Sequence, residues 1–149
     1  MSRSLGCLPP VEVGDEWWFY YSGRTYRHSP YTGKDSGPKF GAIGLAKVKR
    51  GRLVSLEASF DGGTIVTKPL SLAGSTLVLN ANAAHGSIAV SLLDEAGKPV
   101  PGSEATVRGR DGLDLPVALK AGLLKSLARK PVRIRFALAN AQLFGFRVK

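Results

Sequence analysis

Residues 130–138 read KPVRIRFAL, and from Val132 onward apolar side chains recur at every second position. Successive residues of a β-strand point to opposite faces of a sheet, so this alternation predicts a strand buried on one side. The expected inward row is Val132, Ile134, Phe136 and Leu138. Arg133 and Arg135 are expected to point outward into solvent.

The same period of two recurs along most of the chain. Residues 76–83 place Leu77, Leu79 and Ala81 on one face, and residues 87–93 do the same with another apolar row. Turn sequences rich in Gly, Pro and Asp separate such segments, and only residues 122–128 resemble a helical turn. Eight to ten short strands of this kind predict an all-β fold, a two-sheet antiparallel β-sandwich of jelly-roll-like type.

A segment rich in aromatic residues precedes the regular strands. Residues 16–22 read EWWFYYS, and a strand here would place Trp17, Phe19 and Tyr21 on one face and Trp18 and Tyr20 on the other. A strand that is aromatic on both faces is expected to need neighbours on both. The loop over residues 22–40 is longer than ordinary connections, so we expect it to be functional or disordered.

These differences predict three parts. Residues 1–12 are expected to form a flexible N-terminus, residues 13–50 an aromatic strand segment with its long loop, and residues 51–149 the sandwich. Within the last two, residues 42–48 are expected to pair through a basic turn at residues 49–52 with a strand over residues 53–58.

We expect a soluble chain, since residues 1–13 contain no apolar run of a signal peptide or membrane span.

The chain of 149 residues carries a net charge of +10, and no Asp or Glu follows Asp114. Six basic residues mark this C-terminal surface: Lys120, Lys125, Arg129, Lys130, Arg133 and Arg135. They predict either solvated outer faces of strands or a polyanion-binding surface with salt-dependent affinity. Their alternation with apolar residues, without interleaved aromatics, favours solvated faces and makes nucleic acid an unexpected partner.

No catalytic or metal constellation is present in the sequence. There is no Gly-x-Ser-x-Gly string, no phosphate-loop spacing, and the two histidines have no acidic or Cys partners nearby. Glycoside hydrolysis needs two converging carboxylates, whereas the acidic residues here are mostly turn residues, and adjacent Asp15 and Glu16 point to opposite faces. The single Cys7 excludes an internal disulfide. We expect no enzyme activity, no cofactor and no metal.

Recognition of a ligand is the remaining chemistry. Aromatic rings stack on the apolar C–H faces of sugars while nearby polar groups take the hydroxyls. The candidate carbohydrate contacts are Trp17, Trp18, Tyr26, His28 and Tyr31. The alternative is that the strand aromatics bury against a sheet.

Two segments resemble a known family. Residues 14–24 (GDEWWFYYSGR) and 42–50 (AIGLAKVKR), followed by residues 53–56 (LVSL), are similar to final blade strands of five-bladed-propeller glycoside hydrolases of the family 32 and 43 type. Residues 63–69, 77–80, 90–94 and 130–136 resemble the β-sandwich that follows such a propeller. The family's catalytic carboxylates come from earlier blades, so the resemblance transfers no catalytic residue.

The resemblance implies a noncatalytic, carbohydrate-associated accessory domain. An unpaired blade strand leaves open edges and aromatic surface, so residues 13–50 are expected to fold back onto the sandwich, or to pair with a propeller domain or with another copy of the chain. The alternatives are a structural or oligomerisation module without a ligand and, less expected, a polyanion-binding domain.

Overall fold

A computed structural model describes residues 9–24 and 41–149. The chain divides into two units, Met1–Arg50 and Gly51–Lys149, which are described separately below.

The first unit is a three-stranded antiparallel sheet in the order β1-β2-β3, formed by β1 (Val11–Val13), β2 (Glu16–Arg24) and β3 (Gly41–Lys49). Gly14 turns the chain between β1 and β2 with a φ of 62°, a left-handed conformation that suits glycine. Trp18 lies opposite Lys47 on β3 and opposite Val11 on β1. Because opposed residues share a face, the predicted separation of Trp17 from Trp18 onto opposite faces is confirmed.

The second unit contains one short helix and seven strands. Its elements are β4 (Leu56–Ala58), β5 (Gly63–Val66), β6 (Leu70–Ser71), β7 (Leu77–Leu93), β8 (Ala105–Pro116), α1 (Leu123–Ser126), β9 (Pro131–Ala139) and β10 (Ala141–Val148). The path through the sheet is β4-β10-β7-β9-β5, with β6 added to β9 and β8 added to β7. All of these pairings are antiparallel.

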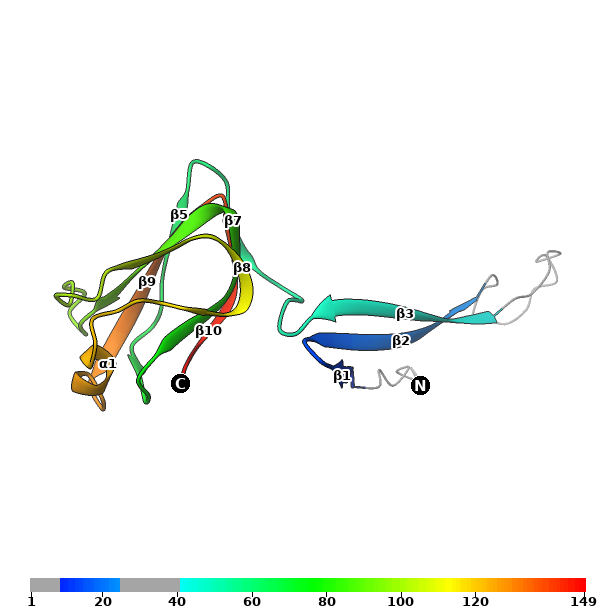
Figure 1. Cartoon of the computed structure of the whole chain (residues 1–149), viewed down its shortest axis with the longest axis horizontal. Helices are drawn as coiled ribbons and strands as arrows, with labels where there is room; N and C mark the ends of the chain where they lie inside the picture. Colours follow the sequence, from blue (N-terminus) through cyan, green and yellow to red (C-terminus); the bar gives the residue numbers. More distant parts are fainter. Residues whose placement is uncertain (1–8, 25–40) are drawn as a thin grey trace, which may run out of the picture. The chain divides into compact units, whose positions relative to one another are not determined.

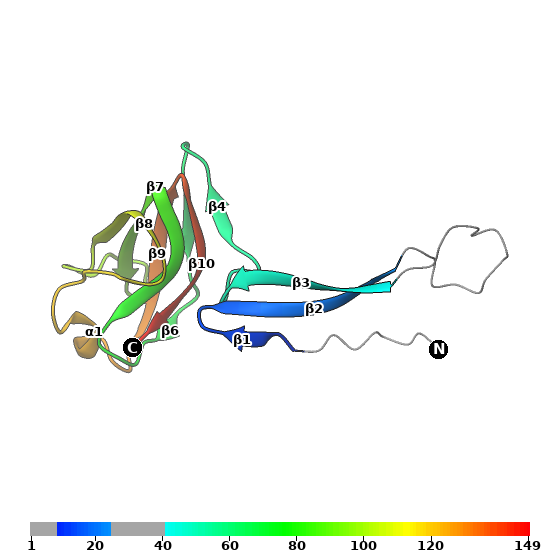
Figure 2. The same cartoon turned by 45° about the vertical axis from the view of Figure 1, so that its right-hand side comes forward.

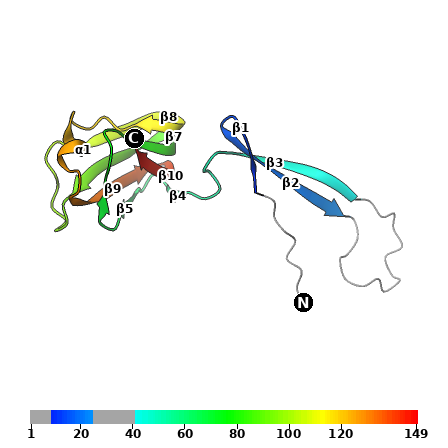
Figure 3. The same cartoon turned by 90° about the horizontal axis from the view of Figure 1, so that it is seen from below.

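The long strand β7 organises this unit (Figures 1 and 2). Its first half pairs with β10, from Leu77 opposite Val148, and its second half pairs with β9, to Leu93 opposite Arg133. Strand β8 runs along the other edge of both halves (Figure 3). Strands β9 and β10 therefore act as one long strand interrupted at Asn140.

Strand β7 and the long strand made of β9 and β10 both bend sharply near their midpoints. The register between β7 and β8 shifts between Ala83 and Ser87, where β7 has extra residues, and such bulges increase local bending. On the opposite edge, Asn140 turns the chain with a φ of 46°. Its Nδ2 donates a hydrogen bond of 2.8 Å to the carbonyl oxygen of His85, which ties the two corners together.

The bend brings apolar rows from both halves of β7 into one core. The buried cluster contains Leu77, Leu79, Ala81 and Ala83 before the bend and Ile88, Val90 and Leu92 after it. The row predicted in β9, Val132, Ile134, Phe136 and Leu138, is buried in the same cluster. The all-β sandwich predicted from the sequence is confirmed, with its layers joined in one continuous sheet.

One polar side chain is fully buried in this core. Ser103 lies just before β8, and its Oγ accepts a hydrogen bond of 3.0 Å from the Leu92 amide and donates one of 2.6 Å to the Val100 carbonyl. A buried hydroxyl that is paired in both roles costs little, whereas an unpaired one is destabilising. Ser103 therefore holds the β7–β8 connection against the end of β7.

Two strand predictions were wrong in their pairing or extent. The segment after the basic turn forms only the short β4, which pairs with β10 and not with β3. The two strands predicted over residues 76–83 and 87–93 are one strand, because the bend at Gly86 interrupts their alternation without ending the hydrogen-bonded ladder.

Replacing Gly86 by alanine is expected to destabilise the second unit by about 3 kcal/mol or more. A Cβ at Gly86 would collide with the backbone carbonyl oxygens of Ala139 and Asn140, which cannot move without opening the corner. Chemical denaturation followed by circular dichroism measures the loss. Gly145→Ala is the matched control, since nothing lies within 4 Å of a Cβ there; equal stability of the two variants would contradict the proposed role of the corner.

Candidate functional site

The two tryptophans named as sugar contacts do not form one platform. The Trp17 indole donates a hydrogen bond of 3.2 Å to Glu12, and the Trp18 indole donates one of 2.8 Å to Glu16. Lys47 places its Nζ 4.0 Å from the centre of the Trp18 ring, on the opposite face of the sheet from Trp17. Both rings are half-buried, and each is already engaged by a charged neighbour.

The other three predicted sugar contacts, Tyr26, His28 and Tyr31, lie outside the described residues. Their contribution to a binding surface stays a prediction.

The predicted basic residues are spread over several elements of the second unit. Lys120, Lys125, Arg129 and Lys130 are exposed around α1. Arg133 is only partly exposed, and its guanidinium donates a hydrogen bond of 3.4 Å to the Thr67 carbonyl. Arg135 is exposed and lines a shallow hollow that also contains Glu104. This opposite charge beside Arg135 weakens the argument for a single polyanion surface.

A broad, open hollow of the second unit lies at the bend of the sheet. It has a volume of about 410 Å³, within the range of small-molecule sites, and we call it the bend cleft. Its lining comes from the β4–β5 turn, the bend of β7, the facing part of β8 and the β9–β10 corner: Phe60, Ala84, His85, Gly86, Ser87, Arg108, Gly109, Ala139 and Asn140.

The position of the aromatic wall of the cleft is fixed by backbone hydrogen bonds. The Ser59 carbonyl accepts hydrogen bonds from the amides of Gly62 (3.1 Å) and Asn140 (2.9 Å), which close the turn and attach it to the corner. Gly62 has a φ of 77°, so the turn suits glycine there. Phe60 stands on this turn with 82% of its surface exposed.

The polar wall of the cleft is built by strand register. Ser87 lies opposite Arg108 on β8 and opposite Ala139 on β9, so these three residues share the outer face. Within the described part of the chain, the side chains of His85, Ser87 and Arg108 have no hydrogen-bond or ion-pair partner. They are therefore available to a ligand.

A smaller hollow of about 140 Å³ adjoins the bend cleft through His85 and Asn140, which line both. Its other lining residues are Glu57, Asn82, Ala141 and Gln142. Gln142 donates a hydrogen bond of 3.1 Å to Glu57, and the Asn82 side chain accepts one of 3.1 Å from the Ala84 amide. The planar polar side chains of this hollow are thus largely held in place by the fold.

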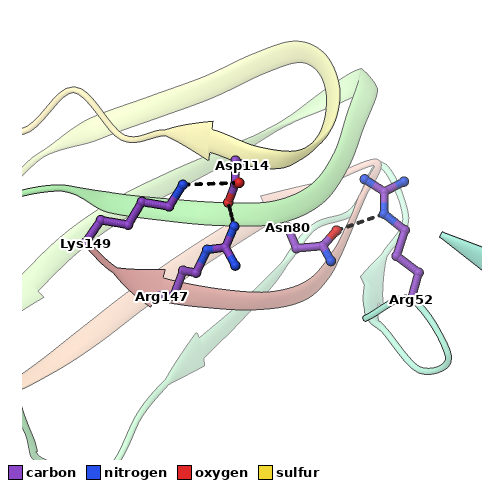
Figure 4. Close-up of polar contacts among 5 residues, drawn as sticks. All are labelled: Arg52, Asn80, Asp114, Arg147 and Lys149. Atoms are coloured by element: carbon purple, nitrogen blue, oxygen red, sulfur yellow. Dashed lines mark hydrogen bonds and ion pairs between the residues drawn. The ribbon is translucent and has the colours of Figure 1, made fainter. Parts of the chain in front are cut away.

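The charged clusters elsewhere in the second unit are internally paired (Figure 4). Arg52 is almost buried; it contacts Asp111 at 2.6 Å, donates to Asn80 Oδ1 at 2.8 Å and lies 4.7 Å from the Phe144 ring centre. Asp114 forms ion pairs with Arg147 and, at 3.2 Å, with Lys149. These contacts join β8 and its neighbours, and they offer no open site.

Neither the bend cleft nor the adjoining hollow brings two carboxylates together. The lining of the bend cleft contains no Asp or Glu, and the adjoining hollow contains Glu57 alone. Across residues 9–24 and 41–149, no three His, Cys, Asp or Glu side chains gather as metal ligands would. In the same ranges no helix has the length and apolarity needed to cross a membrane.

The sequence pattern did not identify the bend cleft. His85 has no acidic or Cys residue near it in the sequence, Ser87 and Arg108 lie in ordinary alternating segments, and Asn140 falls between two such segments. Phe60 carried the only local signal, since a large aromatic side chain in an Asp-Gly-Gly turn has no strand face to cover.

Comparison of the chain with protein-family models, with curated proteins and with solved structures gives no match in any of the three. The similarity of residues 14–24 to a propeller blade therefore stays a prediction.

The carboxyl of Asp114 is expected to titrate below its ordinary value. The hydrogen bond from Arg147 is the largest cause of the lowered pKa; the Lys149 contact adds to it, and partial desolvation opposes it. A folded-state pKa below the unfolded value gives a stabilisation that is present above about pH 4 and lost as pH falls through the lower folded-state pKa. Carbon-detected NMR titration of Asp114 measures the shift. In Arg147→Gln the pKa should move back toward 3.8, and an unchanged value would contradict the assignment.

Proposed function

We propose that this chain is a noncatalytic β-sandwich accessory domain of a glycoside-hydrolase-like protein, and that it binds carbohydrate. The observation that carries the proposal is the bend cleft, which is lined both by an exposed phenyl ring and by polar side chains that have no partner among the described residues. The ring offers a surface for the apolar face of a sugar, and His85, Ser87 and Arg108 offer hydrogen bonds for its hydroxyls.

The absence of carboxylates from the bend cleft supports the noncatalytic part of the proposal. Both inverting and retaining glycosidases place a pair of acids around the scissile bond, roughly 5 to 10 Å apart. Glu57, in the adjoining hollow, has no second acid beside it in the lining. A sugar in the bend cleft would be held without the groups needed to cleave it.

The Phe60→Ala variant tests the proposal. On native gels containing polysaccharide, the wild-type chain should be retarded by at least one polymer of a panel of neutral and acidic glycans. The variant should lose about tenfold in affinity, close to 1.4 kcal/mol, because the stacking surface is removed. Phe60 is so exposed that the fold should remain intact, which circular dichroism checks.

Val54→Ala is the matched control, because Val54 is 78% exposed and lies outside the cleft. Retardation of wild type and both variants to the same extent would refute the bend cleft as the sugar site. Absence of retardation by every polymer would refute carbohydrate binding by this domain.

A second function, an assembly module, is favoured by the first unit. Five apolar side chains on one face of its sheet remain well exposed: Val11 (49%), Val13 (40%), Tyr20 (54%), Ile43 (82%) and Leu45 (39%). None of its described residues is fully buried, and an isolated sheet of this size is marginally stable in water. Such a face gains stability when a partner covers it.

If the first unit drives assembly, the chain should form dimers or larger oligomers at high concentration. Replacing Ile43 and Tyr20 together by Ser and Thr should shift the mass toward the monomer, since it removes apolar surface from the centre of the face. Light scattering coupled to size exclusion measures the mass. A strict monomer at high concentration would rule out self-association.

A further inference from the structure

The charge of the bend cleft points to a narrower class of ligand. Arg108 is exposed in the cleft wall and has no ion-pair partner among the described residues. Residues 105–110 of β8 read ATVRGR, so the part of the strand around Arg108 supplies no compensating acid. Glu57, in the adjoining hollow, already accepts a hydrogen bond from Gln142.

A guanidinium presents a rigid fork of N–H donors whose geometry matches a carboxylate, which can accept two parallel hydrogen bonds from it. The phenyl ring of Phe60 lines the same cleft and matches the apolar face of a pyranose ring. A ligand that satisfies both groups carries an anionic group on a sugar ring. Ser87, opposite Arg108 in register, is placed to bond a neighbouring hydroxyl.

Building on the proposed carbohydrate function, we infer that the bend cleft binds a uronic acid unit, with its carboxylate on Arg108 and its ring against Phe60. Binding a carboxylate there neutralises an otherwise unpaired cation. The volume of about 410 Å³ accommodates one or two sugar rings, so the cleft would recognise a short segment of an acidic polysaccharide.

The test uses the full chain in affinity gels and calorimetry with four probes. Polygalacturonate and alginate are the acidic polysaccharides, a neutral glucan lacks the charge, and inorganic polyphosphate carries charge without sugar. Arg108→Gln and Phe60→Ala are the test variants. Arg110→Gln is the control, because it removes the same charge from the same strand outside the cleft lining.

We expect the wild-type chain to bind an acidic polysaccharide at least tenfold more tightly than the neutral glucan. Arg108→Gln and Phe60→Ala should each lose about tenfold, while Arg110→Gln should stay within about twofold. A different result would be that the chain binds the neutral glucan, that Phe60→Ala weakens this binding and that Arg108→Gln leaves it unchanged. This would overturn the inference of a uronic acid ligand but would leave the proposed carbohydrate function standing.

Two other outcomes would overturn the inference differently. In the first, polyphosphate binds as tightly as the acidic polysaccharides, Phe60→Ala leaves this binding unaffected, and both arginine variants weaken it equally. That result would show nonspecific attraction of polyanions to a basic domain. Failure of all three polysaccharides to bind would remove the proposed carbohydrate function together with the inference.

Discussion

The fold of residues 51–149 depends on a switch, at the corners of one continuous sheet, between odd-numbered and even-numbered residues as the ones that point into the core. The inward positions of β7 are odd-numbered up to Ala83 and even-numbered from Ile88, and β9 and β10 change in the same way across Asn140. Without this change, one half of each strand would turn its apolar row to solvent. The close approach at Gly86 and the left-handed turn at Asn140 make the change possible, so the core exists because the corners do.

Strand alternation allowed most of the fold to be predicted from the sequence. Burial of one face forces a period of two, and this is why the inward row of β9 could be read directly from residues 130–138. The pairing of β4 with β10 could not be read in this way, because register between distant segments depends on how the whole core closes. The bend resembled a break between two strands, since a bulge and a turn disturb alternation alike.

The candidate site was less predictable than the fold for a related reason. Trp17 and Trp18 are large aromatic residues that are easy to identify in the sequence. In the structure, however, they lie on opposite faces of their sheet, and their indole N–H groups already donate hydrogen bonds. The bend cleft combines side chains from four segments that meet only after folding, and neither Arg108 nor Ser87 is unusual in its own strand. A site assembled from tertiary neighbours leaves almost no local pattern, whereas a buried strand face leaves a strong one.

The position of β7 also has a consequence for synthesis of the protein. Each half of this strand needs β10 or β9 as its neighbour, and both follow it late in the chain. On the ribosome, β7 can pair only with β8, which leaves the future core of that hairpin exposed until the chain through Val148 has emerged. Closure of the core therefore has to wait for the synthesis of β10, and the nascent hairpin is the stage at which this domain is open to aggregation or to a chaperone.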